Sequence, residues 1–279
     1  MIEGLSVTSI RTPAGDRFPV AASGDKGVPV LFLHGALGDL RTFAPHVARL
    51  GPERRSLAVT QRWCGTGRWR ADGPAFGVGT HAADLVALAE GLGAGPLRVV
   101  AWSYAGHVAL EAALGRPDLF AGLFLYEPGV RTIPLEPADQ DSFAADAGTV
   151  FGPIVGAIGA GDLERAVRLL IDSSGGDGCF DALPSGRRAV YLENAHTLPR
   201  LVGQEPPPPI SPEALRGLRV PTRVHWGSRS RPFSRLPAVA VAALVGDAGS
   251  GPVEAGHLWP EDDPDGFCEA VRTWADGLA

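Results

Sequence analysis

The stretch LRVVAWSYAGH, residues 97–107, carries an apolar run directly into a serine and a helix-like segment. The apolar residues 99–102 predict a buried strand, and the helix is expected to begin immediately after Ser103. Alanine on each flank, at Ala101 and Ala105, stands where a nucleophile elbow usually has glycine, and such small residues let the sharp turn close. The helix N-terminus then offers free N–H groups to an oxyanion formed at the serine. The simpler alternative is that Ser103 only caps this helix.

Strand-like and helix-like segments alternate on both sides of this junction. Near-continuous apolar runs, such as residues 28–33, are typical of strands buried on both faces of a parallel sheet. The alternation predicts an α/β fold with a doubly wound, mostly parallel sheet. Strands are expected at residues 5–11, 17–22, 28–33, 56–60, 99–102, 123–126, 222–226 and 251–255. Helices are expected at residues 43–50, 107–114, 236–244 and 267–278, and from a cap at Thr80.

The alternation stops between residues 131 and 219. Helical spacing at 163–170 and a helix-like run at 187–198 predict a helical insertion in this part of the chain. Four consecutive prolines, residues 206–209, predict a stiff, extended connector. We therefore expect a core formed by residues 1–130 and 220–279, with the helical insertion 131–219 packed over the carboxyl ends of its strands.

The composition restricts the classes of partner and compartment. A net charge of −6 over 279 residues provides no basic surface for nucleic acid or an anionic membrane. The cysteines Cys64, Cys179 and Cys268 are widely spaced, which predicts neither disulfides nor a zinc site and suits a reducing cytoplasm. No secretory signal is recognised, and the longest uninterrupted apolar run, residues 238–245, is too short to cross a bilayer. We expect a cytoplasmic monomer or homodimer that acts on a small molecule.

Two further features of the sequence converge on Ser103. A His-Gly turn that begins at His34 follows the first buried strand and can direct the Ala36 N–H toward the serine. The Tyr104 N–H is the second predicted donor of an oxyanion hole. A late histidine, His257, stands before the last helix, where a general base returns to the serine. The alternatives are an ordinary glycine-rich turn and a structural histidine.

The acid that would complete a catalytic triad does not follow the usual order. That order places an aspartate after the strand at 222–226, but Ser230 stands there and no carboxylate occurs from residue 220 to 246. A serine can orient His257, but it cannot offset the charge of an imidazolium. Glu127 follows the strand at 123–126, next to the serine strand. We therefore predict a Ser103–His257–Glu127 triad, with a salt-bridge role as the alternative for Glu127.

Several side chains near these positions are predicted to contact a substrate. Some end a strand or flank the serine, and others lie in the helical insertion and would face a pocket from above. For Trp63, a place in the core is the alternative. The predicted contacts are His34, Arg62, Trp63, Trp102, Asn194 and His196.

The order His-Gly, serine, acid, histidine resembles the α/β-hydrolase superfamily over nearly the whole chain. The motifs QRW at 61–63, THAAD at 80–84, WSY at 102–104 and YEP at 126–128 resemble a group of bacterial, mainly actinobacterial, members. The resemblance implies an eight-stranded core, a helical cap inserted after strand six, and no metal or organic cofactor. Some members, among them certain haloalkane dehalogenases, place the acid after strand six. Those dehalogenases and the epoxide hydrolases of this fold use an aspartate nucleophile, so Ser103 argues against both activities.

These observations favour a serine hydrolase. Its expected substrate is an ester or lactone of a small to medium apolar molecule, with the carbon–carbon bond of a diketone as a variant. The rival hypothesis is a non-hydrolytic protein of the same fold, which binds a ligand or acts as a cyclase or lyase with an altered triad. The alanines beside Ser103 and the missing acid after the strand at 222–226 favour that rival.

Overall fold

The computed structural model describes residues 5–67, 69–70, 72–207 and 209–278. Within these residues, eight strands form one sheet in the order β1-β2-β4-β3-β5-β6-β7-β8. β2 pairs antiparallel with β1 and β4, and every other pair is parallel. The predicted α/β fold with a mostly parallel sheet is confirmed. The strands are β1 (Ser6–Arg11), β2 (Arg17–Ser23), β3 (Val30–Leu33), β4 (Ser56–Val59), β5 (Leu97–Trp102), β6 (Phe120–Tyr126), β7 (Thr222–Gly227) and β8 (Gly251–Val253).

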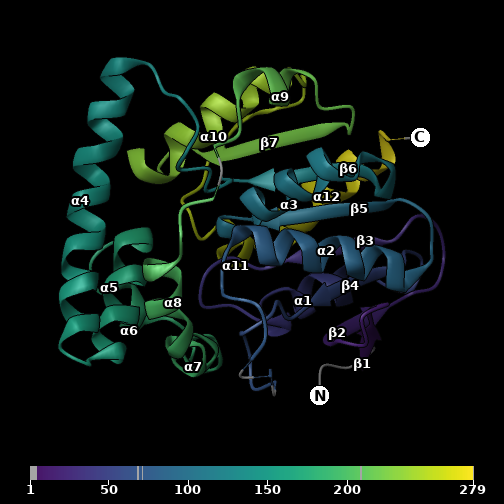
Figure 1. Cartoon of the computed structure of the whole chain (residues 1–279), viewed down its shortest axis with the longest axis horizontal. Helices are drawn as coiled ribbons and strands as arrows, with labels where there is room; N and C mark the ends of the chain where they lie inside the picture. The colour runs from purple at the N-terminus through teal and green to yellow at the C-terminus, as the bar shows by residue number, and fades with distance from the viewer. Residues whose placement is uncertain (1–4, 68, 71, 208, 279) are drawn as a thin grey trace.

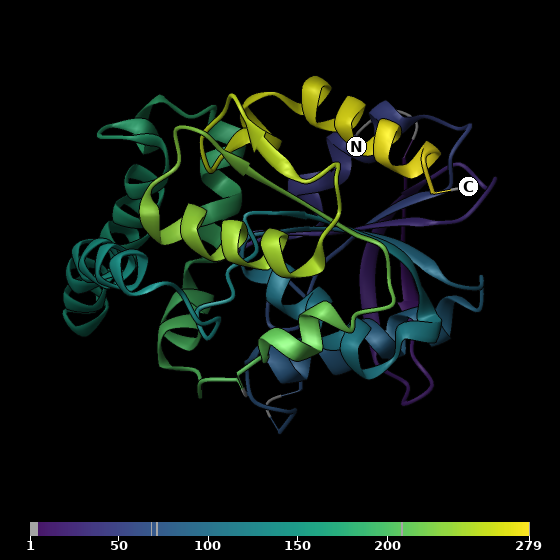
Figure 2. The same cartoon turned by 90° about the horizontal axis from the view of Figure 1, so that it is seen from above.

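Helices cover both faces of this sheet (Figures 1 and 2). The buried side chains of α2, α3 and α10 belong to one core cluster, and those of α1 and α12 belong to the cluster on the opposite face. Figure 2 shows α12, in yellow, and α10, in yellow-green, on opposite sides of the strands. The bounds are α1 (Leu40–Leu50), α2 (Val78–Leu92), α3 (Tyr104–Gly115), α9 (Pro212–Arg216), α10 (Pro232–Val245), α11 (Trp259–Asp262) and α12 (Pro264–Asp276), with 3-10 turns at Pro117–Leu119 and Ala195–Thr197.

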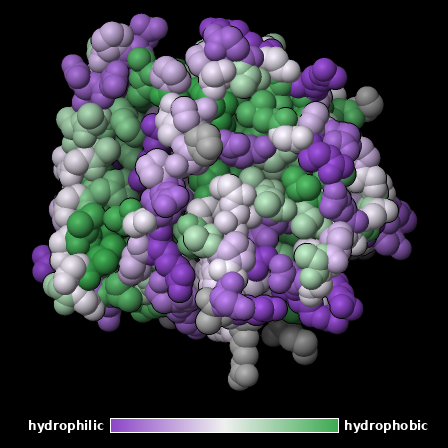
Figure 3. Space-filling model, viewed as in Figure 1, coloured by the Kyte–Doolittle hydropathy of each residue, from purple (hydrophilic) through white to green (hydrophobic). Residues whose placement is uncertain are grey.

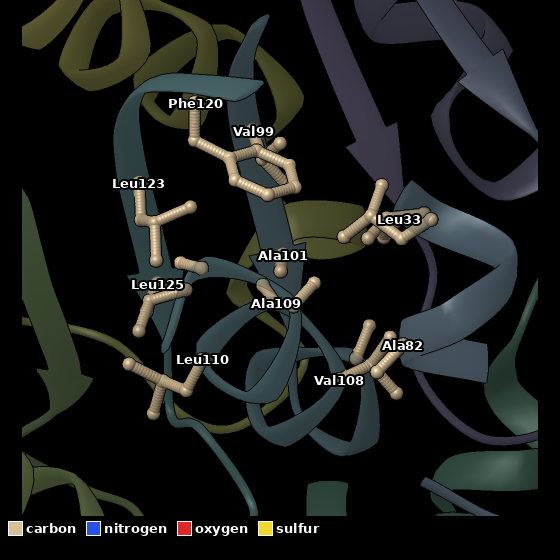
Figure 4. Close-up of a cluster of buried hydrophobic side chains, with 14 of the residues drawn as sticks. Leu33, Ala82, Val99, Ala101, Val108, Ala109, Leu110, Phe120, Leu123 and Leu125 are labelled. Atoms are coloured by element: carbon tan, nitrogen blue, oxygen red, sulfur yellow. The ribbon is translucent and has the colours of Figure 1, made fainter. Parts of the chain in front are cut away.

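The central strand β5 sends alternate side chains into the two cores. Figure 4 shows Val99 and Ala101 of β5 in the same cluster as Val108 of α3. Val100 and Trp102 belong to the cluster on the other face. Because successive side chains of a strand point to opposite faces, an uninterrupted apolar run is what a strand covered on both sides requires. This double burial fixes the end of β5, and with it the serine that follows.

The segment between β6 and β7 supplies a group of helices beside the sheet, which we call the inserted helices. They are α4 (Pro137–Gly159), α5 (Leu163–Gly175), α6 (Cys179–Ala182), α7 (Ser185–Glu193) and α8 (Leu198–Gly203). In Figure 1 the long helix α4 stands at the left edge, with α5, α6 and α8 next to its lower half. Helix α4 packs against α5 and also against α10 of the sheet-covering layer.

Helix α4 was not predicted from the sequence. Its glycines and the internal Pro153 lower its intrinsic helix propensity, so packing against α5 and α10 decides its conformation. The described residues contain one helix, α4, that is long enough and apolar enough to cross a membrane, judged by length and composition alone. Figure 3 shows green, hydrophobic surface along α4 and α5, with purple residues at the N-terminal end of α4.

Two further boundaries differ from the sequence prediction. The Thr80 cap was wrong: α2 begins at Val78 with Gly77 as its N-cap, because the burial of Val78 extends the first turn. The predicted helix at 187–198 is divided, since α7 ends at Glu193 and a 3-10 turn leads into α8. Within the predicted proline connector, residue 208 lies outside the described residues.

Candidate active site

Ser103 occupies a sharp turn between β5 and α3, at the carboxyl edge of the sheet. Its backbone has φ 56° and ψ −120°, a combination that non-glycine residues rarely adopt. The Ser103 N–H donates to the Tyr126 carbonyl, and the Ser103 carbonyl accepts from the N–H groups of Gly106 and Gly129, each at 2.9 Å. The serine side chain makes no capping hydrogen bond to α3. The surrounding backbone therefore imposes the strained turn and leaves the hydroxyl unused by the helix.

Close packing around this turn shows which neighbours must be small. Ala101 and Ala105 are fully buried, and the turn forms with their methyl groups in place. A Cβ at Gly106 would instead lie 2.5 Å from the Cβ of Pro128, and a Cβ at Gly35 would lie 3.2 Å from the serine Cβ. The glycine that this elbow needs is therefore Gly106, one position beyond the usual motif. The His-Gly turn after β3 lies directly against the serine.

His257 and Glu127 form a hydrogen-bonded pair at the same edge of the sheet. His257 lies on the loop between β8 and α11, and its Nδ1–H donates to Glu127 Oε2. The other carboxylate oxygen, Oε1, accepts a hydrogen bond of 2.8 Å from the Gly227 N–H. Glu127 is 1 % exposed, and among the described residues it has no Lys or Arg partner. This buried carboxylate orients the imidazole and can offset the charge that His257 gains on protonation.

The acid comes from the end of β6, and the end of β7 contributes a backbone group. Glu127 directly follows β6, and its backbone has φ 45°. Ser230, which stands at the usual acid position after β7, has no hydrogen bond to His257 among the described residues. Gly227 lets the His257 loop approach, because a Cβ there would lie 2.4 Å from the Ala255 carbonyl oxygen. The amide of Gly227 thus supports the carboxylate that β6 provides.

Two aromatic side chains hold the loop that carries His257. The Trp102 Nε1–H donates to the His257 carbonyl at 3.0 Å, and the Tyr126 hydroxyl donates to the Gly256 carbonyl at 2.5 Å. With Nδ1 bonded to Glu127, Nε2 is the ring nitrogen that remains for a proton transfer. Ser103 and His257 line one pocket without a hydrogen bond between their described side chains. Such catalytic bonds are often long until substrate binds.

Two backbone N–H groups beside the serine have no acceptor within the described part of the chain. They belong to Ala36 and Tyr104, which line the same pocket as Ser103. Tyr104 is the first residue of α3, where helix N–H groups lack an intrahelical partner. Its hydroxyl lies 2.8 Å from Nδ1 of His81, which fixes the side chain. Both amides are the ones that the sequence predicts for an oxyanion hole.

A pocket of about 440 Å³ lies between the strand ends and the inserted helices. Ser103, His257 and the predicted contact Trp102 line it, so the sheet and the inserted helices enclose one space. The size suits a small to medium molecule. Across the described residues, no three His, Cys, Asp or Glu side chains gather where they could hold a metal ion. The apolar walls include Val150, Phe151, Leu170, Tyr191, Leu201 and Phe233.

Arg62 lies away from this pocket, which corrects its prediction as a substrate contact. Its side chain is 5 % exposed, and its guanidinium forms ion pairs of 2.7 Å with Asp84 and Asp16. These carboxylates raise the pKa of Arg62 further above its ordinary value. Arg62, in the turn after β4, therefore connects α2 to the turn after β1.

His34 and Asn194 also have structural partners instead of a place in the pocket. His34 is fully buried; its Nε2 accepts from the Gln61 N–H at 3.1 Å, and burial lowers its pKa. Asn194 is fully buried as well. The side-chain oxygen Oδ1 of Asn194 accepts a hydrogen bond from the Gly65 N–H at 2.6 Å. The side-chain nitrogen Nδ2 donates to the Asp39 carboxylate at 3.0 Å. Both side chains satisfy buried polar groups, so the prediction that they contact substrate is corrected.

Trp63 and His196 contact each other outside the pocket. His196 Nε2 lies 3.0 Å from the Trp63 carbonyl oxygen, so the histidine joins the turn after β4 to the inserted helices. The Trp63 Nε1–H donates to the Pro74 carbonyl oxygen. The guanidinium carbon of Arg200 lies 4.7 Å from the centre of the Trp63 ring. Trp63 and His196 therefore make structural contacts, and the prediction that they bind substrate is corrected.

The pocket contains residues that the sequence analysis did not single out. Arg131, on the loop after β6, lines it together with Phe151 of α4 and Phe233 of α10. The one available signal was that Arg131 follows the same strand end as Glu127. Phe151 and Phe233 carry no such signal, because they reach the pocket only through the packing of α4 on α10.

Comparison with known proteins identifies the family. A model described as the alpha/beta hydrolase family matches residues 30–270. The chain belongs to the alpha/beta hydrolase family. This agrees with the predicted resemblance, and at this level the chain is a hydrolase. A search of the curated proteins gave no significant match.

Solved structures share the fold of this α/β hydrolase at low sequence identity. A putative lipase from Acinetobacter baumannii has a TM-score of 0.77 at 15 % identity, covering 99 % of this chain and 92 % of that one. An esterase from a Rhodococcus species has a TM-score of 0.76 at 19 % identity, covering 98 % and 100 %. The carboxylesterase CesB from Bacillus subtilis has a TM-score of 0.74 at 18 % identity, covering 98 % and 92 %. At these identities the similarity shows the fold alone.

Proposed function

We propose that this α/β hydrolase is a serine esterase or lactonase whose catalytic triad is Ser103, His257 and Glu127. The observation that carries the proposal is the hydrogen bond from His257 to the buried Glu127, beside a serine held in a strained elbow on the same pocket. A catalytic serine needs a base that is itself oriented by a third group. The solved structures that are named as esterases support the same class by analogy.

In the first half of the reaction, Ser103 attacks the carbonyl carbon while His257 takes its hydroxyl proton. The Glu127 carboxylate stabilises the imidazolium that forms. The N–H groups of Ala36 and Tyr104 bind the oxyanion of the tetrahedral intermediate. The imidazolium then gives its proton to the alcohol oxygen, the carbon–oxygen bond breaks, and an acyl-serine remains.

In the second half, water replaces the alcohol. His257 takes a proton from the water as its oxygen attacks the acyl carbon, and returns that proton to the Ser103 oxygen as the acid leaves. The same backbone N–H groups bind the second oxyanion. An ester or lactone fits this chemistry better than a carbon–carbon bond, because its leaving oxygen needs only the proton that His257 already holds.

The rival hypothesis, a non-hydrolytic protein with an altered triad, depended on the missing acid and on the alanines beside the serine. Glu127 bonds to His257 in place of that acid, and the elbow adopts a positive φ with both alanines present. The missing acid and the alanines therefore no longer favour the rival hypothesis over a hydrolase.

A screen of p-nitrophenyl esters and small lactones tests the proposal. We expect turnover by the natural chain and a loss on the order of 10⁴-fold or more in kcat for Ser103→Ala. Ser173→Ala is the matched control: this second pocket serine bonds to the Leu170 carbonyl at 2.7 Å, and its loss should change kcat by less than about threefold. Turnover that survives Ser103→Ala would contradict the proposal.

A further inference from the structure

Arg131 is a positively charged side chain in the wall of a largely apolar pocket. It follows β6 on the loop that begins at Glu127, and it lines the same pocket as Ser103. Its guanidinium carbon lies 4.4 Å from the Phe151 ring centre and 5.4 Å from that of Phe233. The two rings contact each other edge to face at 5.0 Å. A cation is thus held over two aromatic faces at a fixed place in the pocket.

No carboxylate within the described part of the chain pairs with Arg131. Surrounding protein lowers the pKa of this guanidinium, which still reaches solvent, and no opposite charge among the described residues offsets the effect. Arg231, the second arginine of this pocket, differs: it bonds to Asp146 through Nε at 3.0 Å, which raises its pKa. The fold provides a counterion for one pocket arginine and leaves the other without one.

The stacked arrangement leaves the donors of Arg131 available. A guanidinium that stacks on a ring uses its face, and its N–H groups point outward along its edge. The Arg131 guanidinium donates no hydrogen bond to any described residue, and the residue is exposed to solvent. Among the described residues, two other polar atoms of the pocket lining, Thr132 Oγ1 and Gln204 Oε1, are buried without a hydrogen-bond partner. The pocket lining therefore contains polar atoms that no described residue satisfies.

The pocket itself contains no acid that can serve Arg131. Glu127 is the one carboxylate among its described lining residues, and both of its oxygens are bonded to His257 and Gly227. His107, which also lines the pocket, stays uncharged near neutral pH because burial lowers its pKa to about 4. The described residues of the pocket therefore offer Arg131 no anion, and a ligand can supply one.

We propose that Arg131 binds a carboxylate carried by the substrate, so that the preferred ester or lactone bears one negative charge. This inference rests on the proposed ester hydrolysis at Ser103. The planar fork of a guanidinium matches a carboxylate with two parallel hydrogen bonds. A single unpaired cation among apolar walls suits a monoanion better than a doubly charged phosphate. The sequence-based expectation of an apolar substrate is thereby narrowed to an apolar chain with a carboxylate.

Matched substrates measure this preference directly. The p-nitrophenyl monoesters of succinic, glutaric and adipic acid carry a free carboxylate, and their methyl-capped counterparts do not. We expect the natural chain to favour at least one free acid over its capped form in kcat/KM. Arg131→Met should reduce that ratio roughly 10- to 100-fold, the usual value of a hydrogen bond to a charged group. Its kcat/KM for the capped ester should change much less, and Arg131→Lys should retain part of the preference.

Arg200→Met is the control for loss of an arginine stacked on a ring. Arg200 lies over Trp63, does not line the pocket, and has no ion pair among the described residues. The variant should keep the full preference of the natural chain. If Arg131→Met also keeps it while Ser103-dependent hydrolysis persists, the inference is wrong and the proposed function stands.

A binding measurement separates the inference from the proposed function. Calorimetry of monomethyl glutarate and monomethyl adipate with the Ser103→Ala chain needs no turnover. We expect binding of at least one compound that weakens about tenfold or more when Arg131→Met is added. Binding that depends on Arg131, without hydrolysis of any ester by the natural chain, would support the anion site and overturn the esterase proposal. Binding that is absent, or equal in both variants, would overturn the inference.

Discussion

Two histidines line the pocket beside Ser103, and they differ in what surrounds them. His257, on the loop after β8, donates to the buried carboxylate of Glu127. His107, on α3, has no hydrogen-bond partner at Nε2 within the described part of the chain, and the carboxylate of Glu111 lies 3.7 Å away. Burial lowers the pKa of His107 to about 4. One histidine has a counterion for its charged form, and the other is held neutral.

The difference indicates that the carboxylate, more than proximity to the serine, decides which histidine suits the proposed role of general base. A general base must accept a proton and remain stable while it is charged. Glu127 is 1 % exposed and has His257 as its only side-chain partner among the described residues, so the pair can share that charge. Glu111 is partly exposed and lies beyond the distance of a good hydrogen bond. His107 therefore lacks what the proposed role requires.

Removal of the Glu127 charge should give the largest effect. In Glu127→Gln, His257 loses the group that fixes its tautomer and stabilises its charge, so kcat for an ester should fall by roughly 10³- to 10⁴-fold. The matched control is Glu111→Gln, which removes the carboxylate nearest to His107 and should change kcat less than about threefold. Steady-state kinetics on one ester, with circular dichroism to verify folding, measures both. Equal effects of the two substitutions would contradict the distinction between the histidines.

Moving the acid from β6 to β7 should give an intermediate effect. Glu127→Gln combined with Ser230→Asp places a carboxylate at the usual position after β7, where the buried Ser230 hydroxyl has no hydrogen-bond partner among the described residues. We expect kcat to recover at least about tenfold over Glu127→Gln alone, because either strand end faces the His257 loop. The same assay decides the outcome. No recovery in a folded double variant would show that the β7 position cannot serve His257.

Substitution of His107 should have the smallest effect on activity and a distinct effect on stability. His107→Gln should change kcat less than about twofold. The folded pKa of His107 is about 4, below its ordinary 6.5, so the unfolded chain binds more protons between these values. Stability from the neutral His107 is therefore present above pH 6.5 and is lost as the pH falls toward 4.

Urea unfolding across this pH range measures that contribution. The natural chain should lose free energy of unfolding with falling pH, and His107→Gln should reduce the slope by at most about 1.4 kcal/mol per pH unit, the value for one proton. The charged neighbours Glu111 and Arg131 are the same in both chains. An unchanged slope would show that His107 is not held neutral.

The sequence predicts most of the fold and the groups that we propose to react, because their signals are local. Buried parallel strands leave uninterrupted apolar runs, and the carboxyl ends of such strands meet at one edge. Ser103 and Glu127 directly follow β5 and β6, and His257 lies on the loop after β8, as that rule leads one to expect. The same reasoning brings the amide of Ala36 to the serine.

Other features depend on partners far away in the sequence. Arg62 pairs with Asp84 and Asp16, and neither pairing can be predicted from the residues around it. Helix α4 is rich in glycine and forms through packing on α5 and α10, so its local composition does not predict a helix. The setting of Arg131 in turn depends on α4 and α10, which supply the two aromatic rings.

The most direct test of the central claim is covalent labelling by a fluorophosphonate, followed by intact mass. A serine activated by the His257–Glu127 pair should give one adduct in the natural chain and none in Ser103→Ala. Glu127→Gln should react more slowly, by roughly the factor expected for kcat. The account would be contradicted by a folded natural chain that gives no adduct, by an adduct that persists in Ser103→Ala, or by Glu127→Gln reacting at the natural rate.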